Sequence, residues 1–199
     1  ANCRYIDANA GARRGNDKKR LFTSSDEGVT QMPNYVKNKI SFQSDSASEI
    51  INVIAPDGYI DFNTLIPCPL HIYQGHLSGE DEDDFGGNTW MEWSRANWGV
   101  KWNAETSVIE NDGQSVSITF TTAWSKLYPF VIAFANRFKL NFKYEYACEI
   151  QEWWGTEEWT CGVEFGTPRS WRLSKSEGVD SEWEAIYTSV YGRSPNIEE

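Results

Sequence analysis

One short stretch limits the fold of this chain more than any other. It runs TSVIENDGQSVSITFTTAW, and in it two segments of alternating apolar and polar residues flank Asn111-Asp112-Gly113. Turns of this composition between alternating segments are typical of a β-hairpin, because asparagine, aspartate and glycine accept the positive φ angles that tight hairpin turns require. The fold is therefore expected to contain at least one antiparallel pair of strands.

The rest of the chain changes between strand and helix periodicity. Residues 35–42 alternate as a strand does, and residues 46–54 carry a capping-box pattern followed by an apolar helical stripe. Residues 125–138 carry a second helical stripe, strands are expected on either side of a turn at Gly155, and a last helix is expected from Asp180. This order predicts an α+β fold in which an antiparallel sheet has helices packed on one face, as in ferredoxin-like domains.

The sequence divides into an arm and one domain. Residues 1–31 are polar without a sustained period, and are expected to be a flexible arm or a non-native extension before Met32. Residues 32–199 are expected to form a single α+β domain, because a chain of this length buries a sizeable core. Within it, residues 59–69 are expected to be extended, and the stretch at about 70–95 looks like an insertion that holds both histidines and an acidic run.

Charge narrows the class of partner. The chain has 29 acidic and 18 basic residues, for a formal net charge of −11 at pH 7. Such a surface repels the phosphates of nucleic acids and attracts basic surfaces. A protein partner with a basic surface is therefore expected, and direct nucleic-acid binding is not. No apolar run approaches the roughly 20 residues that span a bilayer, so no membrane contact is expected and a cytoplasmic location is.

Four short stretches carry a family resemblance. They are MPNYVKN at 32–38, FNTLIPCP at 62–69, NWGVKWNA at 97–104 and FTTAWS at 120–125. In this order they resemble the landmarks of the YubB-like family of phage and conjugative-plasmid proteins, which have a ferredoxin-like domain. The resemblance covers roughly residues 32–166, and leaves 167–199 as a C-terminal helical extension. The motif residues are Asn34, Asn38, Pro67, Pro69, Trp98, Gly99, Lys101, Trp102 and Trp124.

The resemblance implies origin on a mobile element and no established catalytic residue. Genes of this kind often travel with host-directed accessory functions. The resemblance therefore implies an accessory protein that binds and inhibits or redirects a host protein, with host takeover or anti-defence as its purpose. A structural or replication accessory protein of a phage is the alternative within the same setting.

The stretch NWGVKWNA has two interpretations. Trp98 and Trp102 lie four residues apart around a turn that Gly99 permits, and the two asparagines are expected to bond the loop backbone. The favoured interpretation is a structural corner, because large aromatic side chains usually fill cores. The alternative is a tryptophan platform for binding, with Lys101 beside it.

Two clusters are candidate partner-binding sites. The first is the acidic run of the insertion, for which a solvated loop is the plain alternative: Glu80, Asp81, Glu82, Asp83 and Asp84. The second lies in EIQEWWGTEEWT, where tryptophans alternate with acids and are candidate aromatic anchors at a protein interface: Trp153, Trp154 and Trp159. Ordinary alternation in a packed hairpin is the plain alternative for the second cluster.

An enzyme is the competing class. Paired carboxylates such as Glu157 and Glu158, with a divalent ion, would suit a hydrolase. His71 and His76 are competent metal ligands, but their spacing matches no metal-binding signature, so no metal or cofactor is expected. Phosphate-binding and nucleophile-elbow motifs are absent from the sequence.

The four cysteines leave one question open. They lie far apart and include no C-x-x-C motif, so neither a zinc ribbon nor a disulfide framework is indicated. Buried thiols are expected. Cys148 and Cys161 lie on neighbouring strand-like segments, but spacing alone does not decide whether they form a disulfide.

Overall fold

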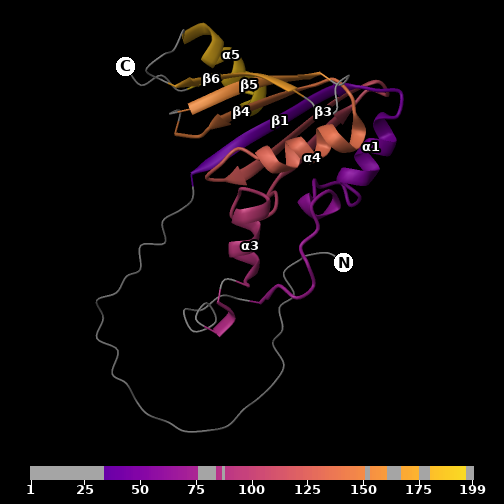
Figure 1. Ribbon diagram of the computed structural model, residues 1–199. Helices are drawn as coiled ribbons and strands as arrows, with labels where there is room; N and C mark the ends of the chain where they lie inside the picture. Colours follow the sequence, from indigo (N-terminus) through magenta and orange to yellow (C-terminus); the bar gives the residue numbers. More distant parts are fainter. Residues whose placement is uncertain are drawn as a thin grey trace, which may run out of the picture.

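Six antiparallel strands form one sheet in the part of the chain that the structure describes. The computed structural model describes residues 34–75, 84–86, 88–150, 153–160, 167–174 and 180–195. Its strands are β1 (Tyr35–Gln43), β2 (Ser107–Asn111), β3 (Ser115–Ala123), β4 (Phe142–Cys148), β5 (Trp153–Thr160) and β6 (Thr167–Ser174). Their order is β2-β3-β1-β4-β5-β6, and every neighbouring pair is antiparallel (Figure 1). The prediction of an α+β fold with an antiparallel sheet is confirmed.

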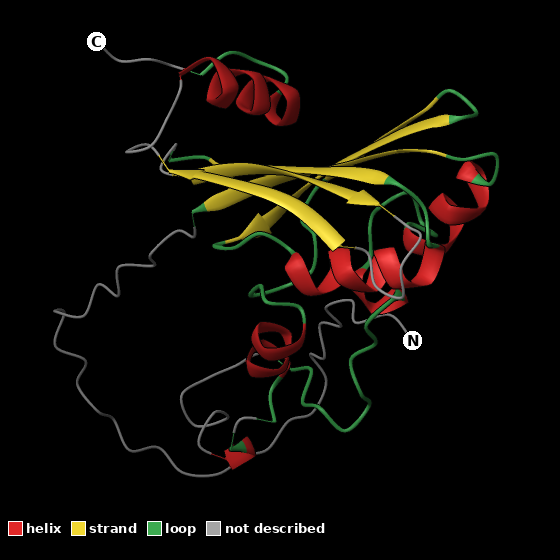
Figure 2. Cartoon of the chain, turned by 45° about the horizontal axis from the view of Figure 1, so that its top comes forward, coloured by secondary structure: helices red, strands yellow, loops and turns green. Residues whose placement is uncertain are grey.

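The helices lie on both faces of this sheet. They are α1 (Ala47–Ile54), the short 3-10 helix η1 (Phe62–Thr64), α3 (Trp90–Asn97), α4 (Tyr128–Phe138) and α5 (Asp180–Tyr191). Figure 2 shows α5 on one side of the sheet and the other helices on the opposite side. We call the face toward α1 and α4 the core face, and the face toward α5 the open face.

The core face carries the main hydrophobic core. In β1, residues alternate between buried and half-buried positions, with Val36, Ile40 and Phe42 directed into the core. Phenylalanines from other elements meet there: the ring of Phe62 in η1 lies 6.1 Å from Phe120 and 5.2 Å from Phe130. Burying each such side chain contributes about 1.5–3 kcal/mol, which makes this face the principal source of stability.

The expectation that helices pack on one face is wrong for α5. Ala147 of β4 and Trp154 of β5 point to the open face, where they form a separate cluster with Ile186, Tyr187 and Val190 of α5. Successive strand residues point to opposite faces, so these two apolar side chains create a patch that only a second layer can cover. The apolar face of α5 provides that layer.

The strongest local predictions are confirmed. Strands β2 and β3 form the hairpin, in which Asn111 Oδ1 accepts from the Gly113 N–H at 2.9 Å and Gly113 has a φ of +102°. Helices α1, α4 and α5 occupy the expected segments, with Pro129 in the first turn of α4. The capping box before α1 does not form, because the Ser46 side chain makes no cap hydrogen bond.

Other local predictions are wrong. Gly155 lies inside β5, opposite Tyr146, and the chain turns between Cys148 and Trp153 instead. An isolated glycine within a strand allows a close approach and need not mark a turn. The segment 59–69, expected to be extended, contains η1, and two elements were not anticipated: α3 inside the insertion and β6 inside the expected helical extension.

Candidate functional site

The first and last motif stretches of the family resemblance lie side by side. The Trp124 N–H donates to the Asn34 carbonyl at 2.8 Å. Deeper in the core, Asn38 Nδ2 donates to Thr122 Oγ1 at 2.9 Å. Both contacts join the start of β1 to the end of β3, which pair from Tyr35 opposite Ala123 onward.

The two middle stretches join the same region. The Phe62 N–H donates to Asn103 Oδ1 at 3.0 Å, and Trp98 Nε1 donates to the Ile66 carbonyl at 2.9 Å. The loop that carries Pro67 and Pro69 follows directly, so segments that are far apart in the sequence form one structural unit.

Within this unit, NWGVKWNA is a structural corner, as favoured from the sequence. Trp98 is 4% exposed, and its ring packs edge-on against Phe62. Gly99 has a φ of +77°, which only glycine adopts readily, and Asn97 Nδ2 donates to the Trp93 carbonyl at 2.9 Å. Lys101 and Trp102 are half-buried, and Lys101 Nζ lies 4.8 Å from the ring centroids of both Trp102 and Trp124.

A buried polar network extends across the core face. The Tyr144 hydroxyl donates to Asn38 Oδ1 at 2.6 Å and accepts from the Leu127 N–H at 3.0 Å. Burial raises the pKa of Tyr144 well above its ordinary value, and the nearby charge of Glu157 raises it further. Tyr144 therefore remains a neutral hydrogen-bonding group that fixes the start of α4 on the sheet.

Glu157 ends this network in a buried ion pair. Lys126 Nζ lies 2.6 Å from Glu157 Oε1, and Trp159 Nε1 donates to Glu157 Oε2 at 3.2 Å. Burial by itself would lower the pKa of Lys126, but the hydrogen bond to Glu157 and the neighbouring charges of Tyr146 and Glu157 outweigh it and raise the pKa. The amine stays protonated and both carboxylate oxygens are engaged, so the pair has a structural role.

The interpretation of Glu157 and Glu158 as paired catalytic carboxylates is wrong. Adjacent strand residues point to opposite faces. Glu157 is fully buried on the core face, whereas Glu158 is exposed on the open face. Among the described residues, no group of three or more histidine, cysteine, aspartate or glutamate side chains is placed to hold a metal ion. His71 is exposed, and His76 lies outside the described residues.

The interpretation of Trp154 and Trp159 as interface anchors is also wrong. Trp159 is 3% exposed and stacks on Phe142 with ring centroids 5.4 Å apart. Trp154 is 2% exposed and packs against Trp183 of α5. Helices cover both faces of β5, which buries both tryptophans. Trp153 is half-buried against the core cluster, so its role as an anchor stays a prediction.

Two other sequence expectations fall largely outside the described residues. Of the acidic run, Asp84 is described and exposed, while Glu80, Asp81, Glu82 and Asp83 are not described, so their role in binding stays a prediction. Cys148 is buried on the core face and Cys161 is not described, so a disulfide between them stays an open question.

A groove of about 1070 Å³ lies at one end of the sheet. It lies beyond the part of the open face that α5 covers, and serine, glutamine, asparagine and threonine side chains supply much of its lining. Ser117 lines it, and the buried Oγ of Ser117 has no partner among the described residues.

The groove is negatively charged. Three exposed carboxylates line it, those of Glu110, Asp112 and Glu158, while Lys143 is its cation among the described lining residues. Lys143 Nζ is already held by Glu145 Oε1 at 2.8 Å. Sequence reasoning missed this site, although the polar positions of the alternating strand segments are the signal that marks it.

Hydrogen bonds fix two of these charges. The N–H groups of Ser115 and Gln114 donate to Asp112 Oδ1 at 2.7 and 3.0 Å, and they hold the pKa of Asp112 below its ordinary value. Glu145 Oε2 also accepts from Ser189 Oγ of α5 at 3.1 Å, so Glu145 keeps Lys143 oriented toward itself. Among the described residues, neither Glu110 nor Glu158 forms an ion pair.

No family model matches this chain, and neither a curated protein nor a solved structure is significantly similar to it. No helix in the described ranges combines the length and apolar character needed to cross a bilayer.

Proposed function

We propose that this protein acts by binding a partner protein with a basic surface, and that the groove on the open face receives that surface. The observation that carries the proposal is the negative charge of the groove: its lining exposes the carboxylates of Glu110, Asp112 and Glu158, and its described cation, Lys143, is paired with Glu145. Complementary charge steers a partner toward such a surface and fixes its orientation. The net charge of −11 favours the same class of partner.

The family resemblance supports a partner in the host of a phage or plasmid. Binding would then inhibit or redirect a host protein, and counter-defence is one form of that role. The arrangement of β1 to β4 supports assignment to the ferredoxin-like class, because the elements β1-α1-β2-β3-α4-β4 follow its β-α-β-β-α-β order with α1 and α4 on one face. The acidic run that includes Asp84 would add to the attraction.

A charge-reversal pair tests the groove. The variant Glu110→Lys with Glu158→Lys changes two exposed groove residues, and Asp112 is left intact because it closes the hairpin turn. Fluorescence anisotropy measures binding of a labelled, short arginine-rich peptide to the full chain at two salt concentrations. We expect affinity to fall at least about tenfold and the dependence on salt to become shallower, because charge pairs across the interface are lost.

The matched control changes net charge equally but elsewhere. Glu49→Lys with Glu182→Lys reverses two exposed acids on α1 and α5 that do not line the groove. This control should keep most of the affinity. Equal weakening by both pairs would mean that overall charge alone attracts the peptide and that the groove is not the docking site.

A further inference from the structure

A second surface, at the other end of the sheet, combines one exposed and one half-buried tryptophan ring with cations. We call it the aromatic–cationic patch and define it as Arg95, Lys101, Trp102 and Trp124. Lys101 Nζ lies 4.8 Å from the ring centroids of both Trp102 and Trp124, and Arg95 Cζ lies 5.6 Å from that of Trp124. The patch unites α3, the corner loop and the end of β3.

The backbone of Trp124 is strained. Its φ is +68°, and the one other described non-glycine residue with a positive φ is Lys139, at the C-cap of α4, where a left-handed residue is usual. A bulky side chain in this region is a genuine outlier. Trp124 is 43% exposed, so burial of its ring gives the core little in return for that strain. Strained residues of this kind cluster at binding sites.

The patch is locally positive in an acidic protein. Lys101 makes no ion pair within the described ranges, and its ammonium group meets indole rings instead. Arg95 pairs with Glu92 at 3.2 Å, but both side chains are well exposed, so this pair is weak and a partner can replace it. In addition, Trp102 Nε1 is buried and has no hydrogen-bond partner in the described part of the chain.

We propose that the aromatic–cationic patch docks an acidic protein segment, which presents carboxylates to Lys101 and Arg95 and an apolar side chain to Trp124. Tryptophan and arginine are the residue types that most often dominate binding energy at protein interfaces. A strand of nucleic acid fits less well, because backbone tracking needs several uncompensated cations. Here Lys101 is the one patch cation without a described ion pair, in a chain of net charge −11.

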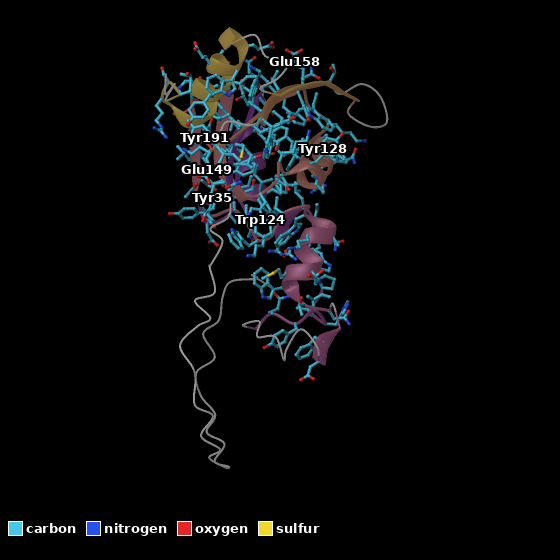
Figure 3. All side chains as sticks on the ribbon, turned by 90° about the vertical axis from the view of Figure 1, so that its left-hand side faces the viewer. Tyr35, Trp124, Tyr128, Glu149, Glu158 and Tyr191 are labelled. Atoms are coloured by element: carbon cyan, nitrogen blue, oxygen red, sulfur yellow. The ribbon has the colours of Figure 1, made fainter. Side chains whose placement is uncertain are left out.

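This site is separate from the groove and does not depend on it. Trp124 follows Ala123, which pairs with Tyr35 at the start of β1, whereas Glu158 pairs with Lys143 opposite Ser41 near the end of β1. Figure 3 shows Trp124 and Glu158 at opposite ends of the sheet. Two sites of opposite charge would let the protein bring a basic partner and an acidic partner together.

Two variants test the patch in the full chain. Trp124→Gly removes the ring and relieves the strained φ, so lost binding cannot be assigned to a weakened fold. Lys101→Gln removes the charge and keeps the length of the side chain. The probe is a fluorescein-labelled peptide of alternating glutamate and phenylalanine, followed by anisotropy. Thermal unfolding of each variant is recorded alongside.

We expect both variants to weaken binding of the peptide at least tenfold, while Trp124→Gly unfolds at no lower temperature than the parent. Ile132→Ala, which truncates a 37% exposed apolar side chain on α4, should leave the affinity unchanged. Unaltered binding in both patch variants would overturn the proposal. So would tighter binding of an oligothymidylate that the same variants abolish, because the patch would then be a nucleic-acid platform.

Discussion

The two faces of the sheet differ in how completely they are covered. On the core face, side chains from all the strands β1 to β5 join one continuous cluster with α1, η1 and α4. On the open face, a cluster of five buried residues suffices to hold α5, and the neighbouring strand positions carry polar side chains that line a groove. One face therefore stabilises the fold, and the other leaves surface for recognition.

Strand β5 shows the difference within a few residues. Glu157 and Trp159 point into the core and bond to each other, whereas Glu158 between them is exposed at the groove. Residues of one chemical type thus have different roles according to the face they occupy. The sequence marks both Glu157 and Glu158 as candidate functional carboxylates. The face of the sheet that each occupies decides that Glu157 is structural and that Glu158 is accessible.

The largest expected effect comes from removing a tryptophan on each face. Trp159→Ala should lower the free energy of unfolding by about 4 kcal/mol, because it leaves a cavity in the main cluster. Trp154→Ala should act locally, because its contacts are mainly with α5. Hydrogen exchange should then speed up in α5 while β1 and β3 stay protected. Global destabilisation of equal size by both changes would contradict the division into two clusters.

A second comparison uses the ion pairs of the two faces. Lys126→Met leaves Glu157 buried without its partner and should cost about 3 kcal/mol at neutral pH. Lys143→Met should cost less than about 1 kcal/mol, because Lys143 is 47% exposed in its side chain and Glu145 retains the Ser189 hydroxyl. Urea unfolding measures both. Equal costs for the two variants would contradict the difference between the buried ion pair and the exposed one.

The last expected effect is a gradual loss of stability in alkali. Burial raises the pKa of Tyr144 and Tyr191, and the pKa of Lys126 is also raised. A group whose pKa is higher in the folded state than in the unfolded state contributes its full stabilisation below its unfolded pKa. For these groups the unfolded pKa is about 10. Above that pH the unfolded state loses protons first, so stability should fall by about 1 kcal/mol per group and pH unit.

The midpoint of urea unfolding, recorded from pH 8 to pH 11, measures this fall in stability. This pH range extends to both sides of the ordinary pKa of about 10. Tyr144→Phe and Tyr191→Phe each remove one ionising group, on the core face and the open face respectively. Each should flatten the alkaline decline relative to the parent. A decline of unchanged steepness in both variants would mean that other groups cause it.

Local signals predicted much of the fold. The Asn-Asp-Gly hairpin, the stripe of α4 and the face of α5 depend on neighbours in the sequence, and all three formed where expected. The turn at Gly155 did not, because a glycine inside a strand and a glycine at a turn look the same until the partner strands are known. The candidate site was harder to predict than the fold, because two of the three tryptophans proposed as interface anchors are buried in the core.

The sequence by itself determined which segments alternate, which are amphipathic and that the chain is acidic, since these properties reside in the order of the residues. Tertiary structure alone decided that β5 is covered on both faces, that Glu157 is locked to Lys126, and that Trp124 is exposed beside Lys101. The physical reason is that burial and ion pairing depend on which distant segments come into contact. A strand with apolar residues on both faces does not by itself determine which helices will cover those faces.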